Sequence, residues 1–224
     1  MNAQVKPVLI DLYCGAGGAT KGYQRAGFYV VGVDINPQPH YCGDDFILGD
    51  CLELGPDILR LADAVHASPP CGRYTRKPSR FGRTRVHFLE HPDLIGPTRA
   101  MLGDCGLPYA IENVAGSPMR SDVMLCGSMF GLRIIKHRHF ELNFVPAYLL
   151  PPCNHLGAYY PFQGEGRSAA EHREAQGTPW IPMHGGRCRK AGRTGDLNNA
   201  IPPAFTEWLG GHLMEQVEGR RVAL

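Results

Sequence analysis

Short apolar runs alternate with amphipathic segments over the first two thirds of the chain. Apolar runs bounded by glycine, proline or aspartate predict buried strands at 8–13, 29–34, 64–67 and 109–114. Helical patterns are found between them, at about 19–26 and 93–103. Strands separated by helices in this way predict an α/β fold, in which a mostly parallel sheet is covered by helices on both faces.

The pattern changes after residue 142. Residues 143–196 are rich in proline, glycine, arginine and histidine, and contain one short helical pattern at 169–176. A longer amphipathic pattern at 204–217 follows two prolines. We therefore expect a main domain over 1–142, a small loop-rich lobe over 143–196 and a C-terminal segment over 197–224.

Composition limits the class of protein. The chain has 224 residues, 43% hydrophobic and 20% charged, which is typical of a soluble globular protein with one main domain. It has no apolar run of membrane-spanning length, and residues 1–7 lack the layout of a secretion signal. We expect a cytoplasmic protein that has no membrane partner. The formal charge is only +2, so affinity for nucleic acid must come from local basic clusters.

The eight cysteines are scattered along the chain, which favours free thiols in a reducing compartment over a disulfide framework. Cys153 and His155, together with Cys126 or Cys188, are candidate zinc ligands. Their spacing fits no regular paired-ligand pattern, so we expect no metal site.

Candidate ligand-binding residues follow the predicted strands, and in such sheets ligands bind at the carboxyl ends of the strands. A glycine-rich turn, 11–18, joins the first strand to a helix. Its glycines allow close approach of the backbone, and the helix N-terminus offers N–H groups to a carboxylate. Asp34 ends the second strand and suits two ribose hydroxyls, although a carboxylate that caps a turn is the alternative.

A cysteine and a glutamate end two further strands. In Ser68-Pro69-Pro70-Cys71 the two prolines fix the direction of the chain and place the thiol at the active edge of the sheet. Glu112 ends the next strand, where its carboxyl group faces the same cleft. A thiolate beside a carboxylic acid suggests covalent attack assisted by proton donation, whereas a buried structural thiol is the alternative for the cysteine alone.

Seven motifs in this order resemble the DNA cytosine-5 methyltransferase family. They are Asp11–Gly18, Val33–Asn36, Gly49-Asp50, Ser68–Cys71, Glu112–Val114, Lys136–Arg138 and Asn199–Pro203. The resemblance covers most of the chain and implies the Rossmann-like fold of S-adenosylmethionine-dependent methyltransferases. It also implies that residues 1–142 bind the cofactor and catalyse, that 143–196 recognise the target, and that 197–224 return to the catalytic domain.

The resemblance assigns roles to individual residues. It implies a cofactor, S-adenosyl-L-methionine (product S-adenosyl-L-homocysteine), bound by Tyr13, Cys14, Gly15, Gly17, Gly18, Asp34, Ile35, Asp50, Pro69, Asn199 and Ala200. It further implies that Cys71 attacks carbon 6 of a flipped-out cytosine, that Glu112 protonates N3, and that Arg138 stabilises O2.

Basic clusters favour double-stranded DNA as the partner. No acidic residue interrupts the run that follows the nucleophile, which contains Arg73, Arg76, Lys77, Arg80, Arg83 and Arg85. We expect this run to lie along phosphates, the alternative being a solvated loop. Further DNA contacts are expected from Lys136, Arg187 and Arg189.

Three departures from the family pattern affect the prediction. Gly72 stands where glutamine is usual, Asn198 replaces a glycine, and the recognition region is short, which predicts a short or relaxed recognition site. An RNA (tRNA) cytosine-5 methyltransferase, a non-catalytic DNA-binding or cofactor-binding module, and an enzyme acting on free nucleotides are the alternatives. The compact chain resembles standalone phage and mobile-element methyltransferases, which implies a bacterial cytoplasmic setting and a monomer.

Overall fold

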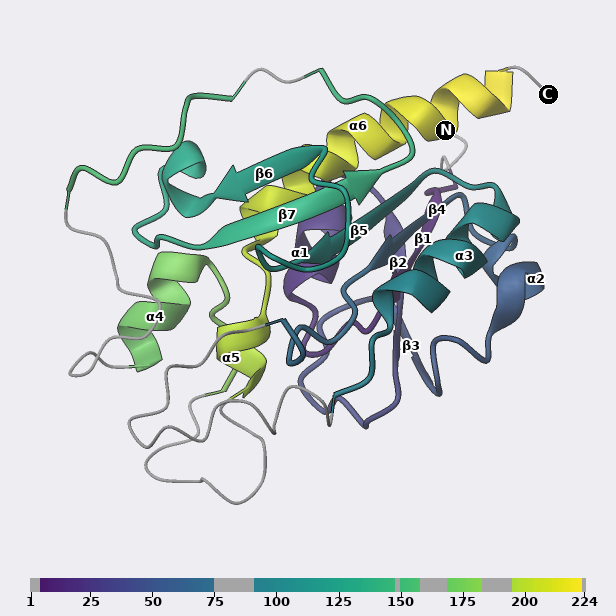
Figure 1. The fold of residues 1–224 in the computed structure, drawn as a ribbon, viewed down its shortest axis with the longest axis horizontal. Coiled ribbons are helices and arrows are strands. Elements are labelled where there is room, and N and C mark those ends of the chain that lie inside the picture. The colour runs from purple at the N-terminus through teal and green to yellow at the C-terminus, as the bar shows by residue number, and fades with distance from the viewer. Residues whose placement is uncertain (1–4, 75–90, 148–149, 158–168, 183–194, 223–224) are drawn as a thin grey trace.

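A mixed seven-stranded sheet forms the centre of the protein (Figure 1). The computed structural model describes residues 5–74, 91–147, 150–157, 169–182 and 195–222. The strands are β1 (Val8–Leu12), β2 (Tyr29–Asp34), β3 (Asp45–Leu48), β4 (Ala64–Ala67), β5 (Tyr109–Asn113), β6 (Val123–Cys126) and β7 (His137–Leu142). Their order is β3-β2-β1-β4-β5-β7-β6. The pairs β5–β7 and β7–β6 are antiparallel, and the other four pairs of described strands are parallel, so β7 runs opposite to the other strands.

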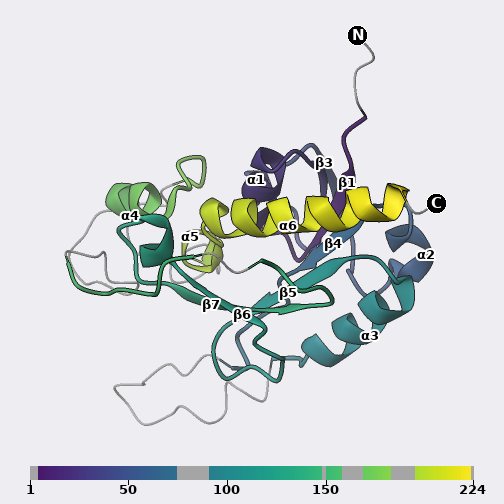
Figure 2. The same ribbon diagram turned by 90° about the horizontal axis from the view of Figure 1, so that it is seen from above.

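Helices cover both faces of the sheet (Figure 2). They are α1 (Gly18–Arg25), α2 (Gly55–Leu59), α3 (Ile95–Cys105), α4 (Ala169–Gln176), α5 (Gly195–Asn199) and α6 (Pro203–Val222). In Figure 2, α1 and α6 lie on one face, whereas α2 and α3 lie on the other. The prediction of a mostly parallel sheet between two helical layers is therefore confirmed.

Each face of the sheet has its own hydrophobic core. Side chains alternate across a strand, so on β1 Leu9 packs toward α1 and α6, whereas Ile10 and Leu12 pack toward α2 and α3. Phe205 on α6 and Leu102 on α3 are completely buried in these two cores. Burial on both faces explains why the central strands are continuous apolar runs rather than alternating ones.

The strand and helix positions that the pattern predicts agree with the structure to within about two residues, except at the C-terminus of α6, which continues to Val222. The pattern did not predict β3, β6, β7, α2 or α5. The six-residue β7 mixes charged and apolar residues. The other four elements have four or five residues each, and β3 is a largely exposed edge strand without apolar alternation.

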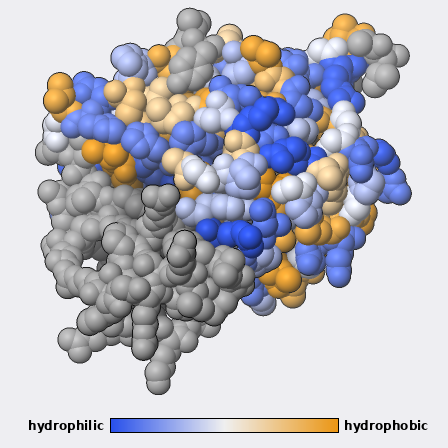
Figure 3. All heavy atoms as spheres, in the orientation of Figure 1, coloured by the Kyte–Doolittle hydropathy of each residue, from blue (hydrophilic) through white to orange (hydrophobic). Residues whose placement is uncertain are grey.

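The described surface mixes hydrophobic and hydrophilic residues, as Figure 3 shows for one face. Among the described helices, none combines the length and the apolar character that crossing a membrane requires.

Candidate active site

A cavity of about 270 Å³ lies at the carboxyl ends of β1, β2, β4 and β5. Parallel strands direct their C-terminal loops to the same edge of the sheet, so motifs far apart in sequence meet there. The residues that line it include Asp11, Tyr13, Cys14, Gly15, Gly18, Asp34, Ile35, Pro69, Cys71, Glu112, Arg138, Asn199 and Ala200.

The glycine-rich turn after β1 forms one wall of the cavity. Tyr13 has a positive φ of 60°, which is unusual for a residue other than glycine, and Gly15 follows with φ 51°. A Cβ at Gly15 would meet no atom of the described residues within 4 Å. The backbone here is accessible to a ligand, as the turn predicted.

Asp34 is held at the mouth of the cavity by two backbone groups. Gly15 N donates a hydrogen bond to Asp34 Oδ2 at 3.1 Å, and Asn36 N donates to Oδ1 at 2.9 Å. Each carboxylate oxygen has a further lone pair, so Asp34 can still accept from hydroxyl groups. Ile35, which is 65% exposed, presents an apolar side chain beside it.

Asp11 lies at the base of the cavity and is completely buried. Thr20 Oγ1 donates a hydrogen bond to its Oδ2 at 2.5 Å. Its Oδ1 has no hydrogen-bond partner among the described residues. Burial raises the pKa of Asp11 to about 7, although the hydrogen bonds with Thr20 oppose the shift. A buried acceptor that lines a cavity suits a cationic donor from a ligand.

The loop that carries Cys71 is fixed to the neighbouring strand. Ser68 N donates to Leu12 O at 3.1 Å, and Asn113 Nδ2 donates to Pro69 O at 2.8 Å. These bonds fix the backbone just before the proline pair and at the peptide between the two prolines, and Cys71 follows at the cavity wall.

The structure gives a physical reason for glycine after the cysteine. A Cβ at Gly72 would lie 2.9 Å from Cδ2 of His91. A longer side chain at this position would therefore require the ring of His91 to move.

Glu112 and Arg138 form a buried ion pair across β5 and β7. Arg138 Nε lies 2.8 Å from Glu112 Oε1, and each side chain is less than a tenth exposed. Burial raises the pKa of Glu112, while the charges of Arg138 and Lys136 and a hydrogen bond from Ser68 oppose that shift. A raised pKa increases the protonated fraction of the carboxyl group at a given pH, and the protonated form is the one that can donate a proton.

A chain of buried hydrogen bonds runs from Tyr23 through His66 to Ser68, which contacts Glu112. Tyr23 Oη lies 2.9 Å from His66 Nδ1, and His66 Nε2 lies 2.8 Å from Ser68 Oγ. Burial lowers the pKa of His66 to about 3, so its imidazole stays neutral at physiological pH. The chain fixes Ser68, which in turn bonds to Glu112.

The structure contradicts the predicted DNA contact of Lys136. This side chain is only 2% exposed, and its Nζ donates to Gln176 Oε1 and to the carbonyls of Asn198 and Ala200. The side chain of Lys136, the residue before β7, extends inward, and three acceptors compensate for its burial. It therefore holds the C-terminal segment against the cavity and cannot reach a phosphate.

Several predicted site residues lie outside the cavity or outside the described residues. Gly17 packs against Cys42, since a Cβ there would lie 2.7 Å from its sulfur. Asp50, which accepts a hydrogen bond from Leu52 N at 2.9 Å, does not line the cavity. Of the predicted DNA-binding side chains, Arg73 is described and Nη1 donates to His91 O at 3.3 Å. The ones outside the described residues are Arg76, Lys77, Arg80, Arg83, Arg85, Arg187 and Arg189.

Sequence reasoning gave no role to several residues that the structure places at or near the site. Gln38 lines the cavity, and Tyr23 and His66 form the hydrogen-bond chain. His66 did carry a signal, because a histidine within a fully apolar strand must find a polar partner. Tyr23 and Gln38 carried none, since each lies in an ordinary polar or helical context.

Two curated proteins resemble parts of the chain, whereas no family model matches it. The type II methyltransferase M1.HphI of Haemophilus parahaemolyticus is 34% identical over 97 residues, which covers 37% of this chain and 25% of that protein. The type II methyltransferase M.AplI of Arthrospira platensis is 31% identical over 84 residues, covering 32% and 22%. The matches thus span about a quarter of these relatives.

Two solved structures resemble the chain over nearly its whole length. The S. pombe Dnmt2 methyltransferase has a TM-score of 0.61 at 14% identity, with 94% of this chain and 99% of that chain covered. The Entamoeba histolytica methyltransferase EhMeth has a TM-score of 0.59 at 13% identity, with 95% and 99% covered. The chain therefore has the Rossmann-like α/β fold of methyltransferases.

Proposed function

We propose that the protein transfers a methyl group from S-adenosylmethionine to carbon 5 of cytosine in double-stranded DNA. One observation carries the proposal: Cys71, Glu112 and Arg138 line the same cavity as the glycine-rich turn and Asp34. The similarity to parts of two type II methyltransferases supports the reaction class.

The cavity fits the proposed cofactor. Asp11 Oδ1 is a buried acceptor suited to the ammonium of the methionine part, and the N-terminus of α1 suits its carboxylate. Asp34 would accept from the ribose hydroxyls, and Ile35 would pack against the adenine. Asn199 and Ala200 also line the cavity, and Lys136 holds their segment through hydrogen bonds to the carbonyls of Asn198 and Ala200. When bound, the cofactor supplies an electrophilic methyl group.

Cys71 performs the first step. Carbon 5 of cytosine is a weak nucleophile, so the thiolate adds to carbon 6 and forms a carbon–sulfur bond. Glu112 gives its proton to N3, which prevents negative charge from building up on the ring. Arg138, already paired with Glu112, stabilises O2 and orients the base.

Carbon 5 then accepts the methyl group and afterwards loses its proton to water. The electron pair of that C–H bond restores the ring double bond, the carbon–sulfur bond breaks, and N3 returns its proton to Glu112. The base must leave the duplex for this chemistry, because carbon 6 is inaccessible within the stack. We propose that the basic run after Gly72 contacts the phosphates and that residues 143–196 recognise the target.

The first test measures product formation. The purified protein is incubated with S-adenosylmethionine and duplex DNA, and 5-methyldeoxycytidine is quantified by mass spectrometry after digestion to nucleosides. We expect Cys71→Ala to lower the rate by about 10⁴-fold or more, because the covalent step is lost. Cys105→Ser is the matched control, since this thiol lies at the end of α3 and outside the cavity.

Other outcomes separate the alternatives. Product on RNA but not on DNA would identify an RNA methyltransferase. Bound cofactor without product on either nucleic acid would indicate a binding module. Activity of Cys71→Ala equal to that of Cys105→Ser would refute the role of Cys71.

A second test isolates the chemistry at carbon 5. DNA that carries 5-fluorocytosine has no proton to lose at carbon 5 after methyl transfer, so the carbon–sulfur bond should persist. We expect a DNA–protein complex that resists denaturing electrophoresis and requires both Cys71 and S-adenosylmethionine. Methylation of an exocyclic amino group would leave no such complex.

A further inference from the structure

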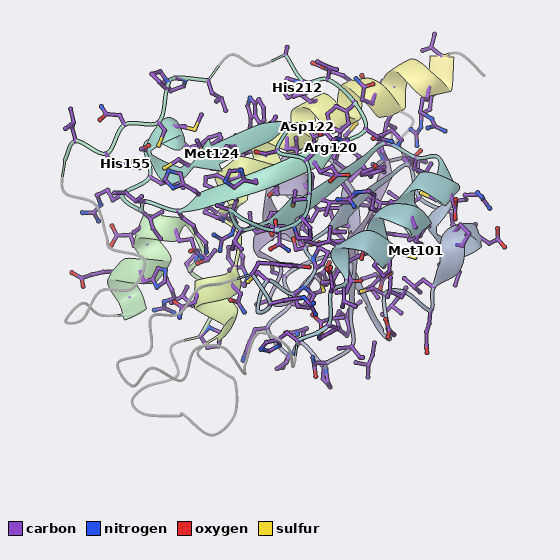
Figure 4. The ribbon with its side chains drawn as sticks, in the orientation of Figure 1. Met101, Arg120, Asp122, Met124, His155 and His212 are labelled. Atoms are coloured by element: carbon purple, nitrogen blue, oxygen red, sulfur yellow. The ribbon has the colours of Figure 1, made fainter. Side chains whose placement is uncertain are left out.

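Two cysteines and two histidines meet at the β6–β7 edge of the sheet, outside the cavity of the proposed active site. They are Cys126 at the end of β6, His137 at the start of β7, and Cys153 and His155 on the segment after β7. Figure 4 labels His155 on that segment, beside the ends of the two strands. Each residue offers one side-chain atom that can bind a metal ion, and these four atoms lie within 4.8 Å of one another.

Two of the distances between ligand atoms equal the edges of a tetrahedron around zinc, and a third is shorter. Cys126 Sγ lies 3.4 Å and Cys153 Sγ 2.8 Å from His155 Nε2. His137 Nε2 lies 3.3 Å from Cys153 Sγ. Thiolate and imidazole ligands at about 2.0–2.3 Å from a tetrahedral zinc ion lie about 3.3–3.8 Å from one another. Small side-chain adjustments would bring all four atoms to a common centre.

The backbone positions the ligands as two pairs. Cys126 and His137 are direct cross-strand partners in the antiparallel β6–β7 ladder, so their side chains share one face of the sheet. Cys153 and His155 are two residues apart on the irregular segment after β7, and their side chains lie together, since Cys153 Sγ is 2.8 Å from His155 Nε2. The two pairs face each other.

A hydroxyl group supports both sulfur atoms. Ser128 Oγ lies 3.4 Å from Cys126 Sγ and 3.6 Å from Cys153 Sγ, and Asn154 N donates to this oxygen at 3.1 Å. Hydrogen bonds to ligand atoms orient them and are usual around metal sites in proteins. The cluster thus has a set of ligands and a group that orients them.

We propose that Cys126, His137, Cys153 and His155 bind one zinc ion. Two thiolates neutralise its charge, and two neutral imidazoles complete a set of sulfur and nitrogen ligands that zinc prefers. Four protein ligands leave no open coordination position, so the ion is structural. It fastens the segment that follows β7, which belongs to the proposed recognition lobe, to the edge of the sheet.

This proposal revises the expectation from the sequence. Spacing suggested Cys126, Cys153 and His155 but argued against a site, because a paired motif normally supplies two ligands from each of two short loops. Here one pair is formed by strand register and includes His137, which the sequence placed only within the Lys136–Arg138 motif. Cys188 lies outside the described residues.

The test measures metal in the full-length protein, purified without chelators and supplied with zinc before removal of the excess. We expect one zinc per chain by inductively coupled plasma mass spectrometry. Cys153→Ser and His155→Ala should each weaken zinc binding by about 100-fold or more, because each removes a ligand. Cys105→Ser and His212→Ala, which lie elsewhere, should retain the full zinc content.

Cobalt substitution of the unaltered protein keeps the test independent of the variants' folding. A cobalt ion with two thiolate ligands should give sulfur-to-metal charge-transfer absorption and intense tetrahedral ligand-field bands. Absence of stoichiometric zinc in the unaltered protein, or retention of zinc by both ligand variants, would overturn the proposal. So would cobalt spectra without thiolate bands, or mass spectra that show Cys126 and Cys153 joined as a disulfide.

Discussion

Asp11 determines how the proposed cofactor site responds to pH. Its carboxyl group is buried in the cavity between Asp34 and Glu112, both of which raise its pKa further through charge repulsion. With a pKa of about 7, the group is largely protonated in the ligand-free protein below that pH. A cationic ammonium binds better to the ionised form, so binding must release this proton in acid.

We therefore predict that affinity for S-adenosylhomocysteine falls as the pH decreases below about 7, approaching tenfold per pH unit. The measurement is isothermal titration calorimetry between about pH 8 and about pH 5.5. Asp11→Asn should bind more weakly and lose this dependence. Asp57→Asn, an exposed carboxylate on α2, should retain it. A flat profile for the unaltered protein would show that Asp11 does not contact the ammonium.

Burial of His66 makes the folded protein less stable as the pH falls. Its pKa is about 3 when folded and about 6.5 when unfolded, so the unfolded state takes up the proton first on acidification. The stabilising contribution is complete above about pH 6.5 and decreases as the pH falls toward about 3.

We expect this residue to lower the free energy of unfolding by about 2 kcal/mol between about pH 7 and about pH 5. Urea unfolding of the unaltered protein and of His66→Gln at both pH values measures the difference, because other titrating groups contribute equally to both. If the free energy of unfolding changed by the same amount between the two pH values in both proteins, the lowered pKa of His66 would be contradicted.

At the scale of elements, the contact between α1 and α6 brings the C-terminal segment to the N-terminal part of the sheet. Gly22 on α1 permits this contact, because a Cβ there would lie 2.1 Å from Thr206 Oγ1 and 2.2 Å from Pro203 O. Thr206 Oγ1 also donates to Ala19 O at 2.8 Å. The two helices pack backbone against backbone, and one of the two atoms that a side chain would meet is a carbonyl that cannot rotate away.

Gly22→Ala should therefore destabilise the protein by about 3 kcal/mol, through overpacking at this contact. Gly211→Ala on α6 is the matched control, because a Cβ there meets no described atom within 4 Å. That substitution should stabilise the protein by about 0.5–1 kcal/mol, since alanine favours the helix. Chemical unfolding measures both, and equal effects would contradict the packing argument.

At the scale of the whole molecule, the chain between β7 and α6 would limit how the proposed DNA substrate is recognised. Part of this region is already used: α4 supplies Gln176 to Lys136, and Trp180 Nε1 donates to Ala16 O at 2.9 Å beside the cavity. Arg173 Nη1 donates to Pro179 O and Ile181 O at 3.3 Å, which closes the turn after α4. These residues pack against the segments that line the cavity rather than extend away from them.

Few residues remain for reading base edges, and each specific contact discriminates at one position. We predict that the recognition site is short or relaxed. Bisulfite sequencing of random-sequence DNA treated with the protein measures it directly. Methylation that strictly requires a long DNA sequence would contradict this prediction.

The sequence by itself determined the α/β layering and the residues at the strand ends, because both depend on local pattern. Apolar runs predicted β1, β2, β4 and β5, and the strand-end residues Asp34, Cys71 and Glu112 all line one cavity. Short elements with little burial, such as β3, carried too weak a pattern.

Only the tertiary structure decided how groups from distant segments pair. The ion pair of Glu112 with Arg138 and the inward course of Lys136 depend on β7 lying next to β5. The cluster of Cys126 with His155 depends on strand register and on the path of the chain after β7. The physical reason is common to all of them: local patterns report which side chains are buried, whereas partners are selected by which strands and segments lie side by side.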